Sequence, residues 1–374
     1  MTLAFSKVAI IGAGAMGRGI AQIAAQAGSQ VWLYDTQAEA IAKARDAVFQ
    51  QWDKLQEKGR LSAEAVAGHK SRLLGATSLQ DLAECELVVE AIVEKLEIKK
   101  SLFTDLEKVL PASAVLVTNT SSLSVTAIAA ALQRPAQFAG YHFFNPVPLM
   151  KVVEVIAGLK TDPAVCQRLS DFARQMGHTP VQAQDTPGFI VNRCARPFYG
   201  EALALMGEGR TASDIDAAMQ AAGYRLGPLS LIDLIGADIN LAATQGMSAV
   251  MGHHPRYHVF PALEAQVAKG HLGRKSGQGF LHPAQPGPAP ADAAQIALRI
   301  EATLINEAHW LLSEGGTTAE GIDTAMKLGL NFPRGPFEAL ALHGRDAVLR
   351  TLAALHSAAP AALKPRYTPA PGLA

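Results

Sequence analysis

The sequence predicts an α/β fold: a Rossmann-type doubly wound sheet followed by all-α C-terminal domains that are tandem duplicated. Three observations support this prediction. Short apolar segments alternate with longer segments of helical period through the first half, which is typical of a mostly parallel sheet covered by helices. The strand-like segments stop at DTPGF, residues 185–189, which contains a Pro-Gly turn. After residue 190 nearly every segment has a helical period, and part of it is repeated.

The strand-like and helical segments of the first half follow one another closely. Apolar runs of strand length are separated early on by amphipathic stretches long enough to cross back over a sheet. The expected strands are 7–11, 30–34, 72–76, 87–91, 115–119, 138–144, 152–156 and 180–183, and the expected helices are 17–27, 37–58, 94–109 and 124–132.

Composition excludes several classes of protein. Of the 374 residues, 49% are hydrophobic and 18% are charged, which is an ordinary globular composition. Basic and acidic residues both number 33, so neither a nucleic acid nor an anionic membrane is expected as a partner. Cys85, Cys166 and Cys194 form no CxxC pair, no leader is evident, and no apolar run is long enough to span a membrane. We therefore expect a cytoplasmic protein with reduced cysteines and no metal.

A glycine-rich turn follows the first expected strand. Gly12 allows the tight turn, Gly14 lets the backbone approach a pyrophosphate, and Gly17 brings the following helix close to the sheet. Ala15 and Met16 lie at the start of that helix, whose free N–H groups face the phosphates. The alternative is a tight strand-to-helix turn without a ligand.

An acidic residue ends the second strand and specifies the cofactor. Asp35 stands where a carboxylate accepts hydrogen bonds from the ribose hydroxyls of a dinucleotide. The same charge repels a 2′-phosphate, so NAD is favoured over NADP.

Polar residues also follow the later strands. Glu90 and Glu94 follow one strand, and NTSS, which includes Asn119 and Ser121, follows the next. Ligands bind at the carboxyl ends of strands in such a sheet, so these residues are expected on the nicotinamide side. Alternatively, Ser122 or Ser124 serves as a helix N-cap, and both interpretations can hold together.

Two further polar residues interrupt apolar strands. His142 lies in one strand and Glu154 in the next, and the connector between them is long enough for the strands to pair. A carboxylate beside an imidazole fixes its tautomer and stabilises the imidazolium, as a general base requires. A histidine satisfied within the core is the alternative.

Five motifs occur in an order that resembles the L-3-hydroxyacyl-CoA dehydrogenase family: GAGAMG, NTSSLS, HFFNPVPLMKVVEV, DTPGFIVNR and GHLGRKSGQGF. The duplication further resembles bacterial members with two tandem C-terminal domains, which act on 3-hydroxyadipyl-CoA or 3-hydroxybutyryl-CoA. The resemblance implies a reversible, NAD-dependent oxidation of an L-3-hydroxyacyl-CoA to a 3-oxoacyl-CoA. It does not specify the acyl chain.

The resemblance also implies roles for individual residues. It implies His142 as general acid/base, Glu154 as its partner, and Ser121 and Asn192 as contacts to the reacting oxygen. For the CoA nucleotide no position matches cleanly; Lys54 and Lys58 are candidates only, since a helical lysine usually just faces solvent. The implied cofactor contacts are Glu94, Lys99, Asn119, Ser121 and Asn145, in addition to Gly12, Gly14, Ala15, Met16, Gly17 and Asp35.

The helical half contains two similar stretches, beginning at Glu201 and Glu307. Ile215-Asp216 matches Ile322-Asp323, and Gly227-Pro228 matches Gly335-Pro336. The second copy is shorter, with no evident counterpart of 253–279. We expect it to pack on the first as a pseudo-dimer within a monomer, or to exchange between chains in a homodimer. The expected domains are 1–186 for NAD, 187–283 helical, 284–295 a linker, 296–357 the second copy, and 358–374 a Pro/Ala-rich tail.

Other functions remain open on the sequence alone. A dehydrogenase of a non-CoA 3-hydroxy or sugar acid would share the glycine turn and the His–Glu pair. A structural or sensing protein would bind NAD(H) without turnover. GHHPRYH, residues 252–258, has histidines, but their spacing is irregular and we interpret the segment as a surface loop and not as a metal site.

Overall fold

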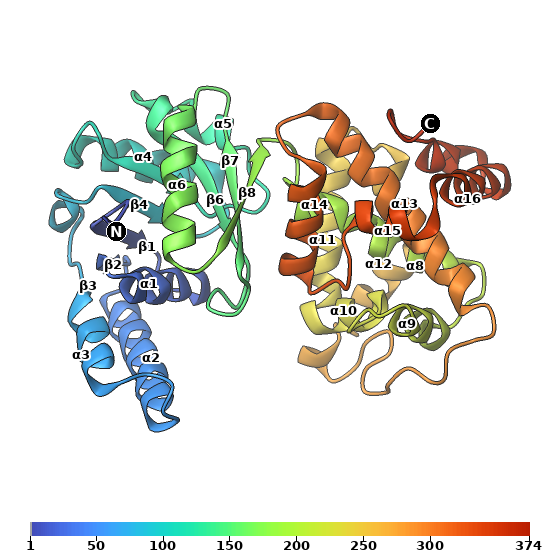
Figure 1. Ribbon diagram of the computed structural model, residues 1–374, viewed down its shortest axis with the longest axis horizontal. Helices are drawn as coiled ribbons and strands as arrows, with labels where there is room; N and C mark the ends of the chain where they lie inside the picture. The colour runs from blue at the N-terminus through green and yellow to red at the C-terminus, as the bar shows by residue number, and fades with distance from the viewer. Residues whose placement is uncertain (1) are drawn as a thin grey trace. The chain divides into compact units, whose positions relative to one another are not determined.

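The computed structural model describes residues 2–374, which divide into two compact units. The first unit extends to Thr186, and the second runs from Pro187 to Ala374 (Figure 1). No helix among the described residues is long and apolar enough to cross a membrane.

The first unit is built on an eight-stranded sheet with the order β3-β2-β1-β4-β5-β6-β7-β8. All neighbouring strands are parallel except β6 and β7, which pair antiparallel. The strands are β1 (Lys7–Ile11), β2 (Gln30–Tyr34), β3 (Leu73–Gly75), β4 (Leu87–Glu90), β5 (Val115–Thr118), β6 (Phe138–Phe143), β7 (Val152–Ala157) and β8 (Thr179–Gln184).

Helices cover both faces of this sheet. The expected segment 94–109 begins two residues later in the structure. The expected segment 124–132 is a shorter helix, and the Ser124 hydroxyl caps its first turn by accepting from the Ala127 N–H. The helices are α1 (Ala15–Ala27), α2 (Ala38–Glu57), α3 (Ala63–Arg72), α4 (Leu96–Val109), α5 (Val125–Ala129) and α6 (Pro163–Gln175), with 3-10 turns η1 (Leu79–Leu82) and η2 (Pro135–Gln137).

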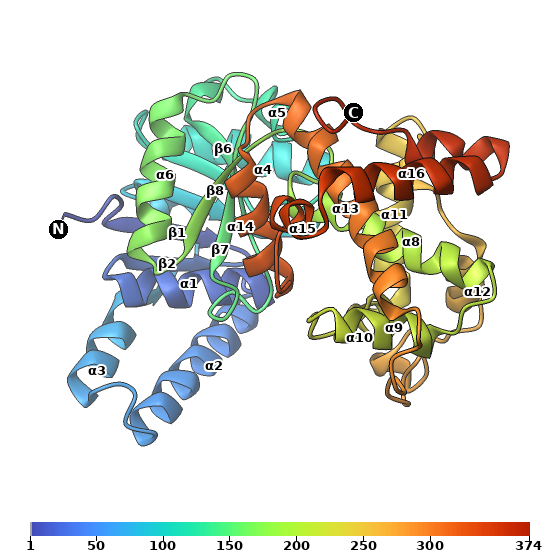
Figure 2. The same ribbon diagram turned by 45° about the vertical axis from the view of Figure 1, so that its right-hand side comes forward.

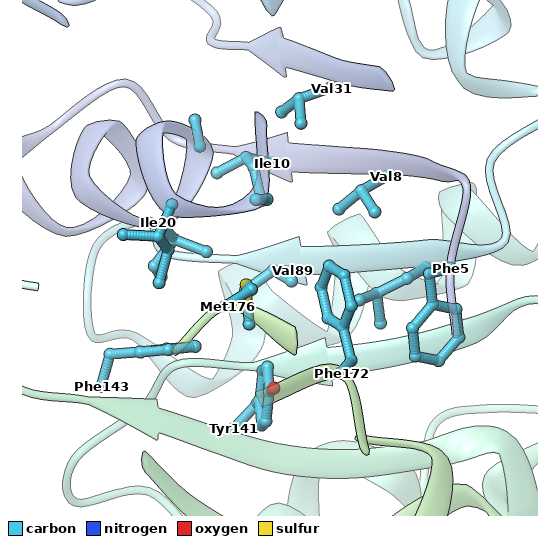
Figure 3. Packing of buried hydrophobic residues seen from close by; sticks show 14 of the residues in the cluster. Phe5, Val8, Ile10, Ile20, Val31, Val89, Tyr141, Phe143, Phe172 and Met176 are labelled. Carbon is cyan, nitrogen blue, oxygen red and sulfur yellow. The ribbon is translucent and has the colours of Figure 1, made fainter. Parts of the chain in front are cut away.

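One face of the sheet packs against α1, α2 and α6. Because side chains alternate along a strand, Val8 and Ile10 of β1 and Tyr141 and Phe143 of β6 point to this same face. Figure 3 shows these side chains against Ile20, Phe172 and Met176, among others. The residues between them, including His142, therefore point to the other face.

The second unit is helical. The longest helix, α13, packs against α8, α9, α15 and α16 and is seen from another side in Figure 2. The helices are α7 (Val191–Cys194), α8 (Arg196–Gly207), α9 (Ala212–Ala221), α10 (Pro228–Ile235), α11 (Ala237–Val250), α12 (Pro261–Ala268), α13 (Ala293–Glu314), α14 (Ala319–Leu330), α15 (Pro336–His343) and α16 (Arg345–Ala358), with 3-10 turns η3 (Pro255–Tyr257), η4 (Arg274–Ser276) and η5 (Ala361–Tyr367).

The repeated Ile-Asp and Gly-Pro landmarks have one structural role in both copies. Asp216 accepts hydrogen bonds from the N–H groups of Leu229 and Ser230 at the start of α10. Asp323 does the same for Phe337 and Glu338 at the start of α15. A Cβ on Gly227 or Gly335 would lie 2.4 or 2.2 Å from the respective aspartate, so only glycine fits there.

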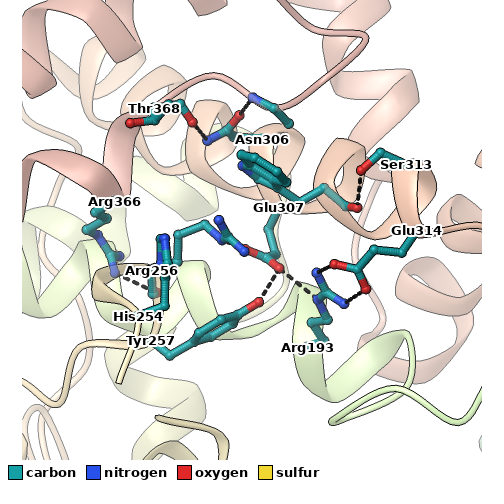
Figure 4. A network of polar contacts seen from close by, with 12 residues as sticks. Arg193, His254, Arg256, Tyr257, Asn306, Glu307, Ser313, Glu314, Arg366 and Thr368 are labelled. Carbon is teal, nitrogen blue, oxygen red and sulfur yellow. Dashed lines mark hydrogen bonds and ion pairs between the residues drawn. The ribbon is translucent and has the colours of Figure 1, made fainter. Parts of the chain in front are cut away.

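The two copies contact each other through an approximately two-fold symmetric polar cluster. Glu307 of α13 accepts hydrogen bonds from Arg193 at 2.8 Å, Arg256 at 2.9 Å and the Tyr257 hydroxyl at 2.5 Å (Figure 4). Glu314, about two helical turns further along α13, accepts hydrogen bonds from the Nη1 and Nη2 atoms of Arg193.

The same contacts recur with the two copies exchanged. Glu201 of α8 accepts hydrogen bonds from Arg299 at 2.7 Å, from Arg366 at 3.1 Å and from the Tyr367 hydroxyl at 3.2 Å. Glu208 accepts hydrogen bonds from the Nη1 and Nη2 atoms of Arg299. Burial raises the pKa of Tyr367 to about 12 and also raises that of Tyr257, so both phenols remain donors. The interface is thus isologous, as in a two-fold dimer, but it lies inside one chain.

Three expectations about the second half are corrected. The helix α13 begins at Ala293, so the linker expected over 284–295 is shorter. The expected tail, 358–374, is packed: Arg366, Tyr367, Ala370 and Leu373 are buried against the second copy and its interface. The GHHPRYH segment is a surface loop only in part, because Gly252 and His253 are exposed whereas Tyr257 is buried and donates to Glu307.

The duplication is also more complete than expected. The PRY triplet at 255–257 has a counterpart at 365–367, so the second copy does match part of 253–279. This match is hard to recognise in the sequence because very few residues separate α16 from η5. The part that is missing begins after η3 and includes α12 and η4.

Candidate active site

The glycine turn between β1 and α1 is open where a ligand would need space and closed elsewhere. Gly12 has φ +104°, and a Cβ there would lie 2.5 Å from the Ala91 carbonyl oxygen. A Cβ on Gly17 would lie 1.8 Å from the Gly12 carbonyl oxygen, so this glycine brings helix and turn together. A Cβ on Gly14 would meet nothing within 4 Å, so the N-terminus of α1, with Ala15 and Met16, faces open space.

Asp35 stands at the end of β2 beside this turn. Its carboxylate accepts from the Ala13 N–H at 2.8 Å and from the Gln37 N–H at 3.0 Å, which fixes it against the loop. A cavity of about 760 Å³ extends from it across the carboxyl ends of β1 and β4. Its lining includes Gly12, Gly14, Asp35, Ile92, Val93 and Ile98. The residues present therefore fit a dinucleotide bound along the first turn.

A buried ion-pair network lies at the end of β4. The Lys99 ammonium is 2.5 Å from Glu90 and 3.2 Å from Glu94, and the Lys99 side chain is only 1% exposed. Glu90 also accepts from the Thr118 hydroxyl at 2.7 Å. Lys99 thus lies behind Glu94 and holds it in place, while its expected contact with the cofactor stays a prediction.

Glu94 in turn organises the NTSS loop. It accepts hydrogen bonds from the Thr120 hydroxyl at 2.6 Å and from the Ser121 N–H at 3.0 Å. Burial raises the pKa of Glu94, but the hydrogen bonds and the Lys99 charge outweigh it and lower the pKa below its ordinary value. The ionised carboxylate therefore fixes the backbone that carries Ser121, which is itself exposed.

His142 and Glu154 are directly opposed in the antiparallel β6–β7 pair. The His142 Nδ1 and a Glu154 carboxylate oxygen lie 2.6 Å apart, and the two side chains are 7% and 0% exposed. The strand register places Gly140 level with Thr118 of β5, so His142 lies just past the end of β5. The expected contact is therefore present, at the same edge of the sheet as the NTSS loop.

Asn119 and Asn145 lie near this pair in the sequence but differ in their surroundings. The Asn119 side-chain oxygen accepts from the Phe143 N–H at 2.8 Å and so joins the end of β5 to β6. Asn145 is exposed in the turn after β6. For Asn119 the structure adds a scaffold function that the sequence did not indicate.

Three further residues were expected at the site, namely Lys54, Lys58 and Asn192. Lys54 and Lys58 are exposed on and just after α2, as ordinary solvated lysines, and neither lines the cavity beside Asp35. Asn192 is half-buried in α7 of the second unit. No group of acidic, histidine and cysteine residues within 2–374 is arranged to hold a metal ion.

Two residues of the site were missed or undervalued. Thr120 accepts from the Leu123 N–H and donates to Glu94, so it is the centre of the NTSS turn. Asp185, expected only as part of a turn, accepts from the Ser124 hydroxyl and the Val125 N–H and so anchors α5. The signal available for Thr120 was that the NTSS cluster has more polar groups than one helix cap needs. Nothing in the sequence indicated the role of Asp185.

Family models match nearly the whole chain. The model described as "3-hydroxyacyl-CoA dehydrogenase, NAD binding domain" matches residues 7–186. The model described as "3-hydroxyacyl-CoA dehydrogenase, C-terminal domain" matches residues 188–282 and residues 296–373.

Individual relatives agree with these models. A 3-hydroxyadipyl-CoA dehydrogenase of Escherichia coli is 45% identical over 75% of this chain. The aligned part spans only 59% of the length of that relative. A probable 3-hydroxybutyryl-CoA dehydrogenase of Deinococcus radiodurans is 42% identical over 73% of this chain and 99% of its own length. A solved structure of 3-hydroxybutyryl-CoA dehydrogenase from Escherichia coli superposes with a TM-score of 0.91 at 33% identity, covering 99% of this chain and 97% of that one.

Proposed function

Since this chain belongs to the 3-hydroxyacyl-CoA dehydrogenase family, we propose that it oxidises an L-3-hydroxyacyl-CoA reversibly to the 3-oxoacyl-CoA, with NAD as cofactor. The observation that carries this proposal is the 2.6 Å contact between His142 and Glu154 at the carboxyl edge of the sheet. A pair of this kind can take up the proton of a hydroxyl group while the carbon that bears it is oxidised.

The His142 imidazole acts as the general base. Its Nδ1 lies against the Glu154 carboxylate, and Nε2 is proposed as the atom that takes the proton of the substrate 3-hydroxyl. Glu154, fully buried, stabilises the imidazolium that results. The Ser121 hydroxyl binds the same substrate oxygen, and the Glu94 network holds its backbone in position. Asn192 is proposed as a further contact to this oxygen.

The cofactor is proposed to be held by the first turn of the sheet. NAD supplies the acceptor of the hydride from the substrate. The N–H groups at the N-terminus of α1 bind its pyrophosphate, with Gly14 leaving the necessary space. Asp35 binds the ribose hydroxyls and repels a 2′-phosphate, which favours NAD over NADP.

The proposed residue roles do not identify the acyl chain of the substrate. A non-CoA 3-hydroxy acid is the alternative substrate. The names of the relatives favour a CoA thioester, either of a hydroxybutyryl or of a hydroxyadipyl group. Rates with 3-hydroxyacyl-CoA substrates of several lengths, with and without a terminal carboxylate, would identify the chain. Turnover of free 3-hydroxy acids alone would contradict the proposal.

The isologous cluster supports a pseudo-dimer within a monomer. We propose that the second copy covers the surface through which a single-copy relative would dimerise, so that the chain does not need a partner. Sedimentation of the full chain tests this. A stable homodimer would favour exchange of copies between chains.

The first mutation to test the mechanism is His142→Gln. We expect kcat with acetoacetyl-CoA and NADH to fall by roughly 10²–10⁴-fold while NADH binding is retained, because only proton transfer is lost. Glu154→Gln should lose less, since the imidazole remains. Wild-type turnover of the His142→Gln variant would exclude this histidine as the base, and loss of NADH binding would indicate a structural defect instead.

A further inference from the structure

A small cavity lies inside the second unit, and its lining includes none of the residues proposed for catalysis. It has a volume of about 10 Å³, enough for one water-sized occupant. Its walls come from α8, α11, η3 and the segment after it, and η5. The lining includes Arg196, Asn240, Thr244, Tyr257, Phe260 and Arg366.

One guanidinium in this region has no carboxylate partner. In the neighbouring cluster the charges balance, with Arg193, Arg256, Arg299 and Arg366 against Glu201, Glu208, Glu307 and Glu314. Arg196 binds instead the Asn192 carbonyl oxygen at 3.0 Å and the Thr244 hydroxyl at 3.1 Å, and no ion pair to it is present among residues 2–374. Burial lowers its pKa, and no acidic residue offsets that effect. Arg196 is therefore a buried guanidinium without an acidic partner, although its central carbon lies 5.1 Å from the centre of the Tyr199 ring.

Two residues that line the cavity each have one polar atom without a partner within 2–374. Within the described part of the chain, the Arg366 Nη2 and the Asn240 side-chain oxygen form no hydrogen bond, although their side chains are 4% and 2% exposed. Gly200 makes room for this guanidinium, because a Cβ there would lie 2.8 Å from Nη2. A buried donor left without an acceptor is costly, so this one is expected to have an acceptor that is not part of the chain.

We propose that this cavity binds one small monovalent anion, of which chloride is the type. Water would satisfy Arg366 but would leave the charge of Arg196 uncompensated in a region from which solvent is excluded. The cavity is too small for a carboxylate or phosphate. Rotation of the Asn240 amide by half a turn presents its NH₂ group as a further donor.

Among residues 2–374, the cavity has no equivalent built around the second copy. The position that corresponds to Arg196 in the second copy is Ala302, which is fully buried. Arg196 lies one helical turn after Asn192 and donates to its carbonyl, so the bound anion stabilises the junction of α7 and α8. An ion here thus supports the segment that carries Asn192.

Thermal unfolding of the full chain in sodium chloride and in sodium gluconate, at equal ionic strength, tests the proposal. We expect the wild-type Tm to rise saturably with chloride, by about 3 °C at ten times the dissociation constant. In Arg196→Met this difference between the salts should vanish. The control Arg350→Met removes an exposed arginine and should retain it.

Crystals soaked in sodium bromide provide a readout that does not depend on any variant. An anomalous peak within hydrogen-bonding distance of Arg196 and Arg366 is the expected result. Water alone at that position, or equal wild-type Tm values in the two salts, would overturn the proposal. So would an undiminished bromide peak in Arg196→Met. Since no readout uses turnover, the outcome is independent of the proposed dehydrogenase activity.

Discussion

The two helical copies share their scaffold but differ at the residues that carry or support chemistry. Both keep the aspartate that starts α10 or α15, and both keep the glutamate at the centre of the polar cluster. The first copy has Asn192 and Asp233 where the second has Leu298 and Ala341. The comparison teaches that a residue retained in both copies maintains the fold, whereas a residue found in one copy has a local task.

The strongest test of the shared scaffold is Glu307→Gln together with its counterpart Glu201→Gln. Each removes the charge that faces two guanidinium groups and leaves them buried, so unfolding should become easier by roughly 3–5 kcal/mol in either variant. Chemical denaturation measures this, and Glu320→Gln on an exposed surface is the control. A large loss of unfolding free energy in one variant and none in the other would show that the two halves of the polar cluster do not contribute equally to stability.

Asn192→Leu gives the first copy the residue of the second. If the amide binds the reacting oxygen, kcat should fall by about 10²-fold with little change in Tm. The reciprocal Leu298→Asn should leave the kinetics unchanged, because the second copy takes no part in the reaction. Full activity of Asn192→Leu would remove this residue from the mechanism.

Asp233→Ala tests an anchor that only the first copy possesses. Its carboxylate accepts from the N–H groups of Phe280, Leu281 and His282, each at 2.8 Å, and so holds the segment that the second copy lacks. We expect a loss of about 2 kcal/mol in unfolding free energy and faster amide exchange at 280–282. Ala341→Asp in the second copy, where no such segment exists, should change stability by less than about 0.5 kcal/mol.

The smallest expected effect concerns the helix caps. Thr211 and Thr318 accept from the N–H groups of Asp214 and Gly321 at 3.1 and 3.0 Å. Replacement by alanine should cost about 1 kcal/mol in either copy. Unequal losses, measured by the same denaturation, would reveal that one copy unfolds before the other.

Much of the fold followed from local patterns. The glycine turn and the strands at 7–11 and 30–34 were predicted to the residue, because apolar runs bounded by glycine leave few alternatives. The contact of His142 with Glu154 was also expected, since a long connector lets the two strands pair. The matching family models and relatives confirm the fold class and the family that five motifs indicated.

Other features depend on contacts between distant parts of the chain. Nothing local distinguishes Lys99, which is buried behind Glu94, from an exposed helical lysine. Arg366 and Tyr367 lie in a Pro/Ala-rich stretch that composition alone assigns to a loose tail, and their partner Glu201 is far away in the sequence. Long-range ion pairs of this kind are determined by packing, which local composition does not report.

The joining of both halves of a two-fold interface in one polypeptide has a consequence for how such a protein can evolve. In a homodimer, every substitution appears twice and must suit both subunits at once. Here each half can change alone, as Leu298, Ala302 and Ala341 illustrate opposite Asn192, Arg196 and Asp233. One half is thereby released from the demands of turnover and is free to specialise as a support for the other.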